Sequence, residues 1–471
     1  MGSSLLKINK WLNDNKESMI NDTLKLLKIN SESYNREEVN NALLKTMEIA
    51  ESLGFRTEIR AGGEIGVVFF GEGEETLGVL AHVDVVPIGD ADAWTHSPYG
   101  EIYGDKIYGR GIVDNKGMVV SSLYAMAAVK ALNIPVYKKV ELIIGTREEI
   151  SWDDLERYKR EGHQLPDYGY TPDGEFPIIN REKGNVELLL KFSDERCEDV
   201  PEILELKAGE AVNSVPDTAY VKIKGNFDYI EKKVLEYNVH NGEKLSVSKE
   251  DEGLYIVEAY GKAAHSSLPE QGDNALVTLC DFLRGINIKN KAANNLTKYV
   301  QDCFRDNCYG ERLGLQNHKS DIEEMGRTTV APTMAYSGDE YNLALSIRSV
   351  YGTSKEEIIM AFDKLGRDYS FTYSITDYLE PLYVSREHKF IRILEKSYEE
   401  ITNTTADFIL AGGTTYAKAM PNTVAFGPIF PGVQDNSHQK DEFILVEKFM
   451  DATKIYALVI SKVLTNEDSL K

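Results

Sequence analysis

Residues 76–84, TLGVLAHVD, are the stretch on which the predicted fold depends. The first six of them are almost wholly apolar, which is typical of a strand buried on both faces of a mixed or parallel sheet. A helix is predicted at 121–132 and a second apolar strand at 140–145. This alternation of strand and helix predicts an α/β domain with a central mixed sheet flanked by helices.

The pattern changes at about residue 185. Residues 186–192 and 341–348 partly alternate apolar and polar side chains, as strands do when one face of their sheet is exposed. After about residue 384 the buried α/β pattern returns and ends in a long amphipathic helix predicted at 441–463. We therefore predict an α/β domain made of residues 1–184 and 384–471, interrupted by an inserted α+β domain of residues 185–383.

Composition narrows the range of partners. The 471 residues include 53 Lys and Arg against 76 Asp and Glu, a formal net charge of −23. Nucleic acids and anionic membranes both attract basic surfaces, so we expect neither as a partner. No run approaches 18 apolar residues, and residues 1–11 do not have the pattern of an export signal. Cys303 and Cys308 could pair, but four scattered cysteines are more typical of free thiols in a reducing compartment, so we expect a cytoplasmic protein.

The first chemically distinctive pair comes directly after the apolar strand. Side chains at the carboxyl end of such a strand point into the crevice where α/β proteins bind ligands. His82 and Asp84 are two residues apart and share a face if the strand continues. An imidazole there could bind a metal while its other nitrogen donates to a carboxylate. The alternative is a histidine that ends the strand without any such role.

Three carboxylates follow further along the chain. In residues 108–117, YGRGIVDNKG, glycines on both sides of Asp114 indicate a sharp turn that presents one carboxylate, although an ordinary Gly-rich turn has the same appearance. Glu148 and Glu149 follow the strand at 140–145. Adjacent carboxylates usually lie on a solvated surface, but at the end of a buried strand they suit a metal ligand beside a proton-transfer base.

Two further residues complete a candidate ligand set. Asp173 lies in a turn after another predicted strand, and His438 lies in a loop shortly before the last helix. Each is a weak signal alone. Together with His82, Asp114 and Glu149 they supply two histidines and three carboxylates. That number suits two divalent metals that share a bridging carboxylate and hold one histidine each.

Four strings in this order resemble one known family. They are HVDVVP at 82–87, GRGIVDNKG at 109–117, GTREE at 145–149 and PDGEFP at 172–177. The family is that of the co-catalytic dinuclear metallopeptidases, which includes aminoacylase, carnosinase, carboxypeptidase G and succinyl-diaminopimelate desuccinylase. The segment TYAKAMPN at 415–422 and the long insertion resemble the bacterial PepV-type dipeptidases in particular. The resemblance implies a zinc-peptidase-like catalytic domain and a lid domain formed by the insertion.

The resemblance also implies roles for residues of the catalytic domain. His82 and Asp173 would hold one metal, and Glu149 and His438 the other. Asp114 would bridge the two metals and would be joined to Asn115 by a cis peptide. Glu148 would be the general base, and Asp84 would be the partner of His82.

In the lid, the string YGKAAHS at 260–266 resembles the motif that supplies an oxyanion-stabilising group, here His265. Without that context His265 would be interpreted as part of a surface turn. Substrate-binding positions are implied for Asn213, for Arg348 and for the loop of Gly412, Gly413 and Thr414. Thr414 stands where relatives usually have a third glycine, which leaves the substrate preference open.

We therefore predict a metal-dependent dipeptidase that acts on small peptides with two divalent ions per chain. Zinc is favoured by the ligand set, with manganese or cobalt as alternatives. The long insertion would let His265 act within one chain, so we expect a monomer. The alternatives are an amidohydrolase of the same family that acts on N-acyl or N-succinyl amino acids, and a peptide-binding protein without catalysis.

Overall fold

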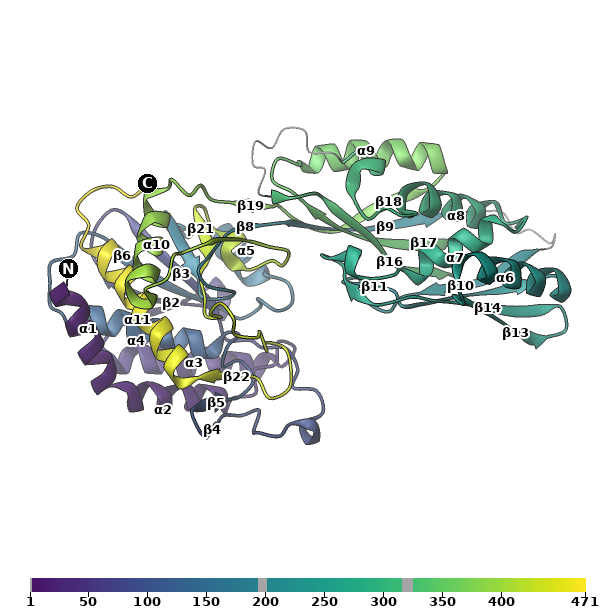
Figure 1. Ribbon diagram of the computed structural model, residues 1–471. Helices are drawn as coiled ribbons and strands as arrows, with labels where there is room; N and C mark the ends of the chain where they lie inside the picture. The colour runs from purple at the N-terminus through teal and green to yellow at the C-terminus, as the bar shows by residue number, and fades with distance from the viewer. Residues whose placement is uncertain (1, 194–200, 316–324) are drawn as a thin grey trace. The chain divides into compact units, whose positions relative to one another are not determined.

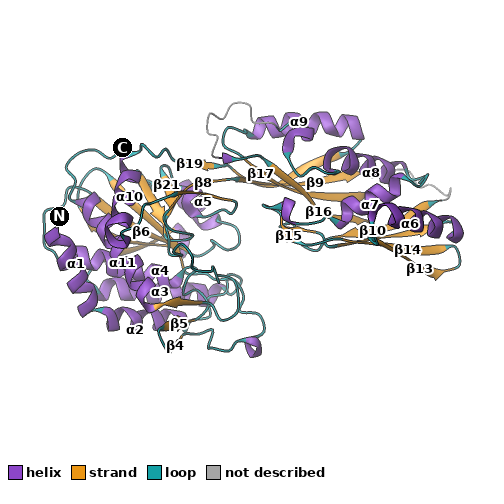
Figure 2. Cartoon of the chain, viewed as in Figure 1, coloured by secondary structure: helices purple, strands orange, loops and turns teal. Residues whose placement is uncertain are grey.

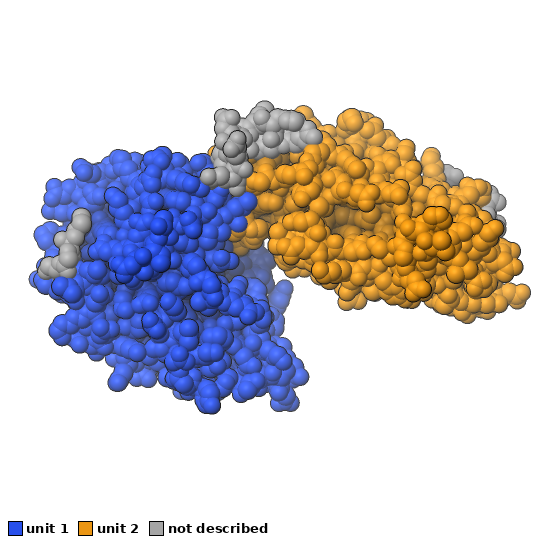
Figure 3. Space-filling view, viewed as in Figure 1, with its two compact units in different colours: residues 1–181, 383–410, 415–471 blue, residues 182–382, 411–414 orange. Residues whose placement is uncertain are grey.

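The structure is a computed structural model that describes residues 2–193, 201–315 and 325–471. The chain divides into two compact units, shown in different colours in Figure 3. The first comprises residues 1–181, 383–410 and 415–471, and the second comprises residues 182–382 and 411–414. The predicted boundaries at 184/185 and 383/384 lie within three residues of these divisions, and residues 411–414 group with the second unit.

A nine-stranded mixed sheet forms the centre of the first unit, as the sequence predicts (Figure 1). The strand order is β1-β2-β6-β3-β7-β21-β8-β19, with β20 beside β8. β3 is parallel to both β6 and β7, whereas β2 is antiparallel to β6. The strands are β1 (Arg56–Arg60), β2 (Ile65–Gly71), β3 (Thr76–His82), β6 (Lys139–Gly145), β7 (Tyr168–Thr171), β8 (Ile178–Glu182), β19 (Leu382–Tyr383), β20 (Phe408–Ala411) and β21 (Thr423–Ala425).

Helices flank this sheet (Figure 2). α4 packs against β3 and β6 and also against α2 and α11, so that it is buried along nearly its whole length. The helices are α1 (Gly2–Asp14), α2 (Lys16–Leu27), α3 (Arg36–Ser52), α4 (Lys116–Lys130), α5 (Asp153–Arg160), α10 (Lys389–Thr402) and α11 (Val446–Leu464). The predicted α/β fold with a central mixed sheet and flanking helices is confirmed.

The last helix begins later than its periodicity predicts. A small sheet consists of β4 (Glu101–Tyr103), β5 (Lys106–Tyr108) and β22 (Phe443–Leu445), and β22 pairs with β5. The residues of β22 therefore extend along β5, and α11 starts only at Val446.

The second unit is built on an eight-stranded sheet of order β13-β14-β12-β10-β16-β17-β9-β18, in which all pairs are antiparallel. Its strands are β9 (Gly184–Phe192), β10 (Glu202–Ala208), β12 (Thr218–Lys224), β13 (Leu245–Asp251), β14 (Leu254–Tyr260), β16 (Thr329–Ser337), β17 (Tyr341–Ser349) and β18 (Thr372–Leu379). A separate pair is formed by β11 (Ser214–Val215) and β15 (Ala264–His265).

One face of this second sheet carries the core of the unit. In β9, Val186, Leu188 and Leu190 are fully buried against side chains of the helices, while Lys191 is exposed. The helices are α6 (Phe227–Asn241), α7 (Ala275–Arg284), α8 (Lys291–Phe304) and α9 (Lys355–Tyr369). The alternating pattern of the sequence thus corresponds to a sheet with one apolar and one polar face.

Among the described residues, no helix combines the length and the apolarity needed to cross a membrane. Cys280, Cys303 and Cys308 are free thiols, and Cys197 lies outside the described residues.

Candidate metal centre

The candidate ligands of the first unit come from loops at one edge of its sheet. β3 ends at His82, which pairs in register with Gly145 at the end of the parallel strand β6. Glu149 follows β6 by four residues, and Asp173 follows the end of β7 by two. Because the carboxyl ends of parallel strands meet at the same edge of a sheet, these side chains converge. Asp114 reaches the same edge from the loop before α4. The last candidate ligand, His438, comes from the loop before β22.

Asp114 lies between the two histidines. Its Oδ1 is 2.9 Å from Nε2 of His82, and its Oδ2 is 2.8 Å from Nε2 of His438. His82 Nε2 is also 3.6 Å from Oδ2 of Asp173, and His438 Nε2 is 3.3 Å from Oε2 of Glu149. The structure therefore brings the five predicted ligands together, with one carboxylate oxygen of Asp114 facing each histidine.

The donor atoms fit divalent metal ions. Within the described part of the chain, Nε2 of His82, Oδ1 of Asp114 and Oε1 of Glu149 are buried and make no hydrogen bond of standard geometry, although Nε2 of His82 and Oδ1 of Asp114 face each other at 2.9 Å. Ligand atoms of His82, Asp114 and Glu149 all lie within 4.8 Å of one another, and so do those of His82, Glu148 and Asp173. Buried polar atoms without partners are costly, and a cation would satisfy all of them. Imidazole and carboxylate ligands suit zinc and its first-row neighbours.

Charge is concentrated at this edge of the sheet. Burial raises the pKa of Glu148 well above its usual range, and neighbouring carboxylates raise it further. Burial also raises the pKa of Glu149 to about 7. Hydrogen bonds to Asp114 and Glu149 raise the pKa of His438 to about 11. Burial acts to raise the pKa of Asp114, but the two histidines outweigh it and hold that pKa well below its usual range. In the metal-free protein, protons on the histidines therefore offset the carboxylates, and metal ions must compete with those protons.

Asp84 contacts both the turn that carries Glu148 and Glu149 and the ring of His82. Its buried carboxylate accepts hydrogen bonds from the backbone N–H groups of Glu148 at 3.1 Å and Glu149 at 3.3 Å, and from the hydroxyl of Ser33 at 2.9 Å. Nδ1 of His82 lies 2.9 Å from the backbone oxygen of Asp84 and 3.5 Å from its carboxylate. The closer partner of His82 is thus the backbone of Asp84, while the carboxylate orients the turn that carries the two glutamates.

A second buried carboxylate, which the sequence analysis did not single out, holds the start of the same turn. Asp154 accepts hydrogen bonds from the backbone N–H groups of Thr146 at 2.7 Å and Arg147 at 3.1 Å. It also accepts the hydroxyl of Tyr416, at 2.9 Å and 3.1 Å from its two oxygens. The ring of Tyr416 stands edge-on to His82, with centroids 6.1 Å apart. Tyr416 belongs to the segment 415–422 that the resemblance identified, but no pattern assigned it a contact.

The peptide bond between Asp114 and Asn115 is cis, as the resemblance implies. The side-chain amide of Asn115 donates to the backbone oxygen of Pro172 at 2.8 Å, next to Asp173. Asn115 therefore connects the loop of the central carboxylate to the turn that carries another candidate ligand.

In the second unit, three of the predicted substrate-binding positions lie around one short strand. His265, on β15, pairs with Ser214 of β11, and the N–H of Ser266 donates to the backbone oxygen of Asn213 at 2.9 Å. Nδ1 of His265 is 2.6 Å from the hydroxyl of Ser267. A Cβ added to Gly412 would lie 3.2 Å from the side chain of Ser267, which brings the loop of residues 412–414 to this strand.

Arg348 lies in the same unit, on β17. The hydroxyl of Ser346, two residues before it, donates a 3.0 Å hydrogen bond to the hydroxyl of Ser266. Arg348 is buried, and its Nε has no hydrogen-bond partner among the described residues. Burial lowers the pKa of His265, and the charge of Arg348 lowers it further. The second unit thus combines a buried guanidinium with an imidazole that stays neutral near pH 7.

Two histidines and several carboxylates meet at the strand ends of a mixed sheet, an arrangement that suits the class of metal-dependent hydrolases. The sequence profile of peptidase family M20/M25/M40 matches residues 78–462, so the chain belongs to this peptidase family. The predicted family and the prediction of a hydrolase that acts on peptide bonds are confirmed.

Individual proteins agree with this assignment. The chain is 34% identical over 463 residues to "Putative dipeptidase YtjP" of Bacillus subtilis strain 168, a match that covers 94% of this chain and 97% of that protein. Its fold is similar to that of human carnosine dipeptidase 1, with a TM-score of 0.59, 16% identity and coverage of 98% and 100%. It is also similar to the di-peptidase Dug1p of Saccharomyces cerevisiae, with a TM-score of 0.61, 13% identity and coverage of 99% and 100%.

Proposed function

We propose that this chain is a dipeptidase that hydrolyses small dipeptides with two divalent metal ions, zinc being favoured and manganese or cobalt the alternatives. The observation that carries the proposal is the position of Asp114, which presents one carboxylate oxygen to His82 and the other to His438. Asp173 would complete the ligands on the His82 side, and Glu149 those on the His438 side. The dipeptidase name of the 34% identical relative supports the substrate class.

Bound ions would supply the Lewis acidity that activates water and polarises the scissile carbonyl at neutral pH. Glu148 accepts the proton of the attacking water and then delivers it to the leaving amine. A carboxylate beside the ligand set, within reach of the attacking water, suits this transfer of one proton in two steps. The hydrogen bond from the backbone N–H of Glu148 to Asp84 keeps the general base in position.

We assign two substrate contacts to the second unit. Arg348 binds the terminal carboxylate of the dipeptide, because a buried guanidinium with an unused N–H suits bidentate recognition of a carboxylate. His265 donates a hydrogen bond to the oxyanion of the tetrahedral intermediate. Its neutral state near pH 7 and the contact of Nδ1 with Ser267 leave Nε2 available for that purpose. Asn213 and residues 412–414 line the same region and would contact the substrate.

We further propose that the protein is cytoplasmic and acts as a monomer. Cys280 and Cys303 are buried free thiols, a state typical of proteins in a reducing compartment. The monomer is proposed because the long insertion, residues 185–383, would let His265 act within its own chain.

The test is hydrolysis of a substrate panel by metal-stripped protein resupplied separately with zinc, manganese and cobalt. The panel contains α-dipeptides, β-alanyl and D-alanyl dipeptides, a tripeptide, and N-acetyl and N-succinyl amino acids. We expect metal-dependent cleavage of dipeptides and its loss in Glu148→Gln. The matched control is Glu75→Gln, because Glu75 precedes β3, at the opposite end of that strand from His82. Cleavage of acylated amino acids alone would favour the amidohydrolase, and inactivity with metal bound would favour a binding protein.

A further inference from the structure

Glu442 is not one of the candidate metal ligands, and none of the motifs that resemble the family includes it. Its side chain is fully buried and accepts four hydrogen bonds. Oε1 accepts the backbone N–H groups of Val113 at 2.9 Å and Asp114 at 3.3 Å. Oε2 accepts the backbone N–H of Gly111 at 3.0 Å and the guanidinium of Arg110 at 2.8 Å. One carboxylate thus holds the whole turn that presents the central carboxylate Asp114.

The backbone of Glu442 contacts the same turn. Its carbonyl oxygen accepts the N–H of Gly109 at 3.0 Å. Side chain and main chain of one residue therefore fix residues 109–114 over their full length. Four of the five contacts go to backbone N–H groups, so their geometry depends on the path of the chain rather than on side-chain rotamers.

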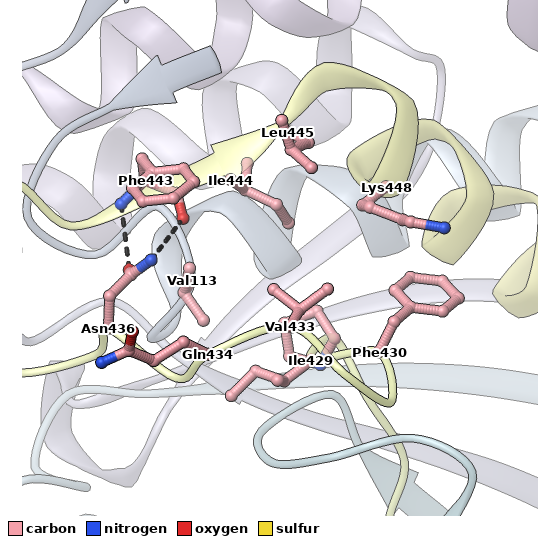
Figure 4. A pocket seen from close by; sticks show the side chains of 11 residues that line it. Val113, Ile429, Phe430, Val433, Gln434, Asn436, Phe443, Ile444, Leu445 and Lys448 are labelled. Carbon is pink, nitrogen blue, oxygen red and sulfur yellow. Dashed lines mark hydrogen bonds between the residues drawn. The ribbon is translucent and has the colours of Figure 1, made fainter. Parts of the chain in front are cut away.

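Glu442 also belongs to the loop that carries His438. The side-chain amide of Asn436 closes this loop, since it donates to the backbone oxygen of Phe443 at 3.2 Å and accepts from the N–H of Phe443 at 3.0 Å (Figure 4). His438 lies between these two ends and has a φ of +61°. Its side chain is 53% exposed, so packing alone does not hold it in place.

We propose that Glu442 is a positioning residue that ties the loop of Asp114 to the loop of His438 and thereby sets the 2.8 Å separation of their ligand atoms. The two residues are 324 positions apart in the chain (438 − 114), and Glu442 is bonded to one loop while it belongs to the other. Hydrogen bonds to a buried carboxylate are strong because no water replaces them. The metal affinity of this half of the site therefore depends on a residue that contacts no metal.

Glu442→Gln is the informative change because glutamine has the same shape. Its single oxygen can accept either from Val113 and Asp114 or from Gly111 and Arg110, and its NH₂ group then faces the donors of the other pair. The turn must shift or leave a buried donor without a partner. Since misplaced outer partners of metal ligands commonly weaken binding by about 10–100-fold, we expect a loss of that size for at least one of the two ions.

The measurement is a zinc titration of the metal-stripped full-length protein in competition with a chromophoric chelator. This inference rests on the proposed metal centre, so the unmodified protein is titrated first. Failure of the unmodified protein to bind two ions would contradict the proposed function. Two tight ions in the unmodified protein and equal affinities in Glu442→Gln would overturn only the inference. Glu75→Gln, the matched control for the same substitution, should bind both ions as the unmodified protein does.

A second variant separates positioning from general stability. Glu442→Gln leaves the buried Arg110 without its carboxylate partner, and Arg110→Met combined with Glu442→Gln removes that unpaired cation. We expect the double variant to recover thermal stability relative to Glu442→Gln while zinc binding stays weak. Recovery of both properties together would show that Glu442 acts only by balancing a buried charge, and would overturn the proposal.

Discussion

Removal of one hydroxyl tests whether the turn before Glu148 is held as described. Tyr416→Phe keeps the ring, which packs edge-on against Trp152 with centroids 5.3 Å apart. It removes only the hydroxyl that lies 2.9 Å and 3.1 Å from the oxygens of Asp154. Asp154 is fully buried, so no water takes the place of this donor.

The expected cost follows from that environment. A hydrogen bond to a charged group contributes about 1.5–3 kcal/mol to stability. Asp154 keeps its bonds from Thr146 and Arg147, so the carboxylate is not left without partners. We therefore expect the free energy of unfolding of the first unit to fall by about 1.5–3 kcal/mol.

The assay is urea unfolding of the metal-free protein, followed by tryptophan fluorescence, with Tyr170→Phe as the matched control. Tyr170 is fully buried in the same unit, and its hydroxyl has no hydrogen-bond partner in the described part of the chain. Removal of this hydroxyl should not lower stability, because a buried hydroxyl without a hydrogen-bond partner is itself unfavourable. If both variants lose equal stability, the bond between Tyr416 and Asp154 does not contribute in the way argued here.

Three further predictions concern the metal centre and the second unit. Glu148→Gln should lower kcat by about 10²–10⁴-fold while both metals stay bound, measured by dipeptide hydrolysis and metal analysis; a full loss of metal would instead make Glu148 a ligand. Since His438 has a pKa of about 11 and that of His82 is also raised, both imidazoles are protonated at pH 7 without metal. Glu149, with a pKa of about 7, also carries a proton part of the time at pH 7. Zinc binding in weak buffer should therefore release two or more protons per chain and tighten as pH rises, whereas no release would contradict the ligand assignment. Arg348→Met should raise the pKa of His265, followed by NMR titration, because a nearby cation disfavours the imidazolium; an unchanged pKa would mean that the two groups do not interact.

The candidate ligands His82, Glu149 and Asp173 could be predicted from the sequence because each ends or closely follows a strand with a clear pattern. β3 is apolar throughout, and its parallel neighbours β6 and β7 bring their carboxyl ends to the edge where it ends. The position of His82 and Asp173 at that edge follows from general rules for parallel sheets.

The supporting contacts could not be predicted in this way. Asp154 and Tyr416 are 262 residues apart, and neither belongs to a pattern that requires the other. The start of α11 was misplaced because the helical periodicity continues through residues that pair with β5 instead. Glu442 follows His438 by four residues in a polar segment, where a glutamate is usually exposed, so that its burial was not visible in the sequence.

The sequence by itself thus determined the fold class and the insertion of a second domain, and it supplied the candidate metal ligands. These properties depend on local periodicity and on side-chain chemistry, which a linear pattern carries. Only the tertiary structure decided that Asp114 faces both histidines, that Asp84 and Asp154 hold the turn of the glutamates, and that Glu442 joins two distant loops. Such contacts depend on which buried N–H groups and charged side chains meet after folding. Each of these buried groups needs a hydrogen-bond partner, and the packing of the chain decides which residue supplies it.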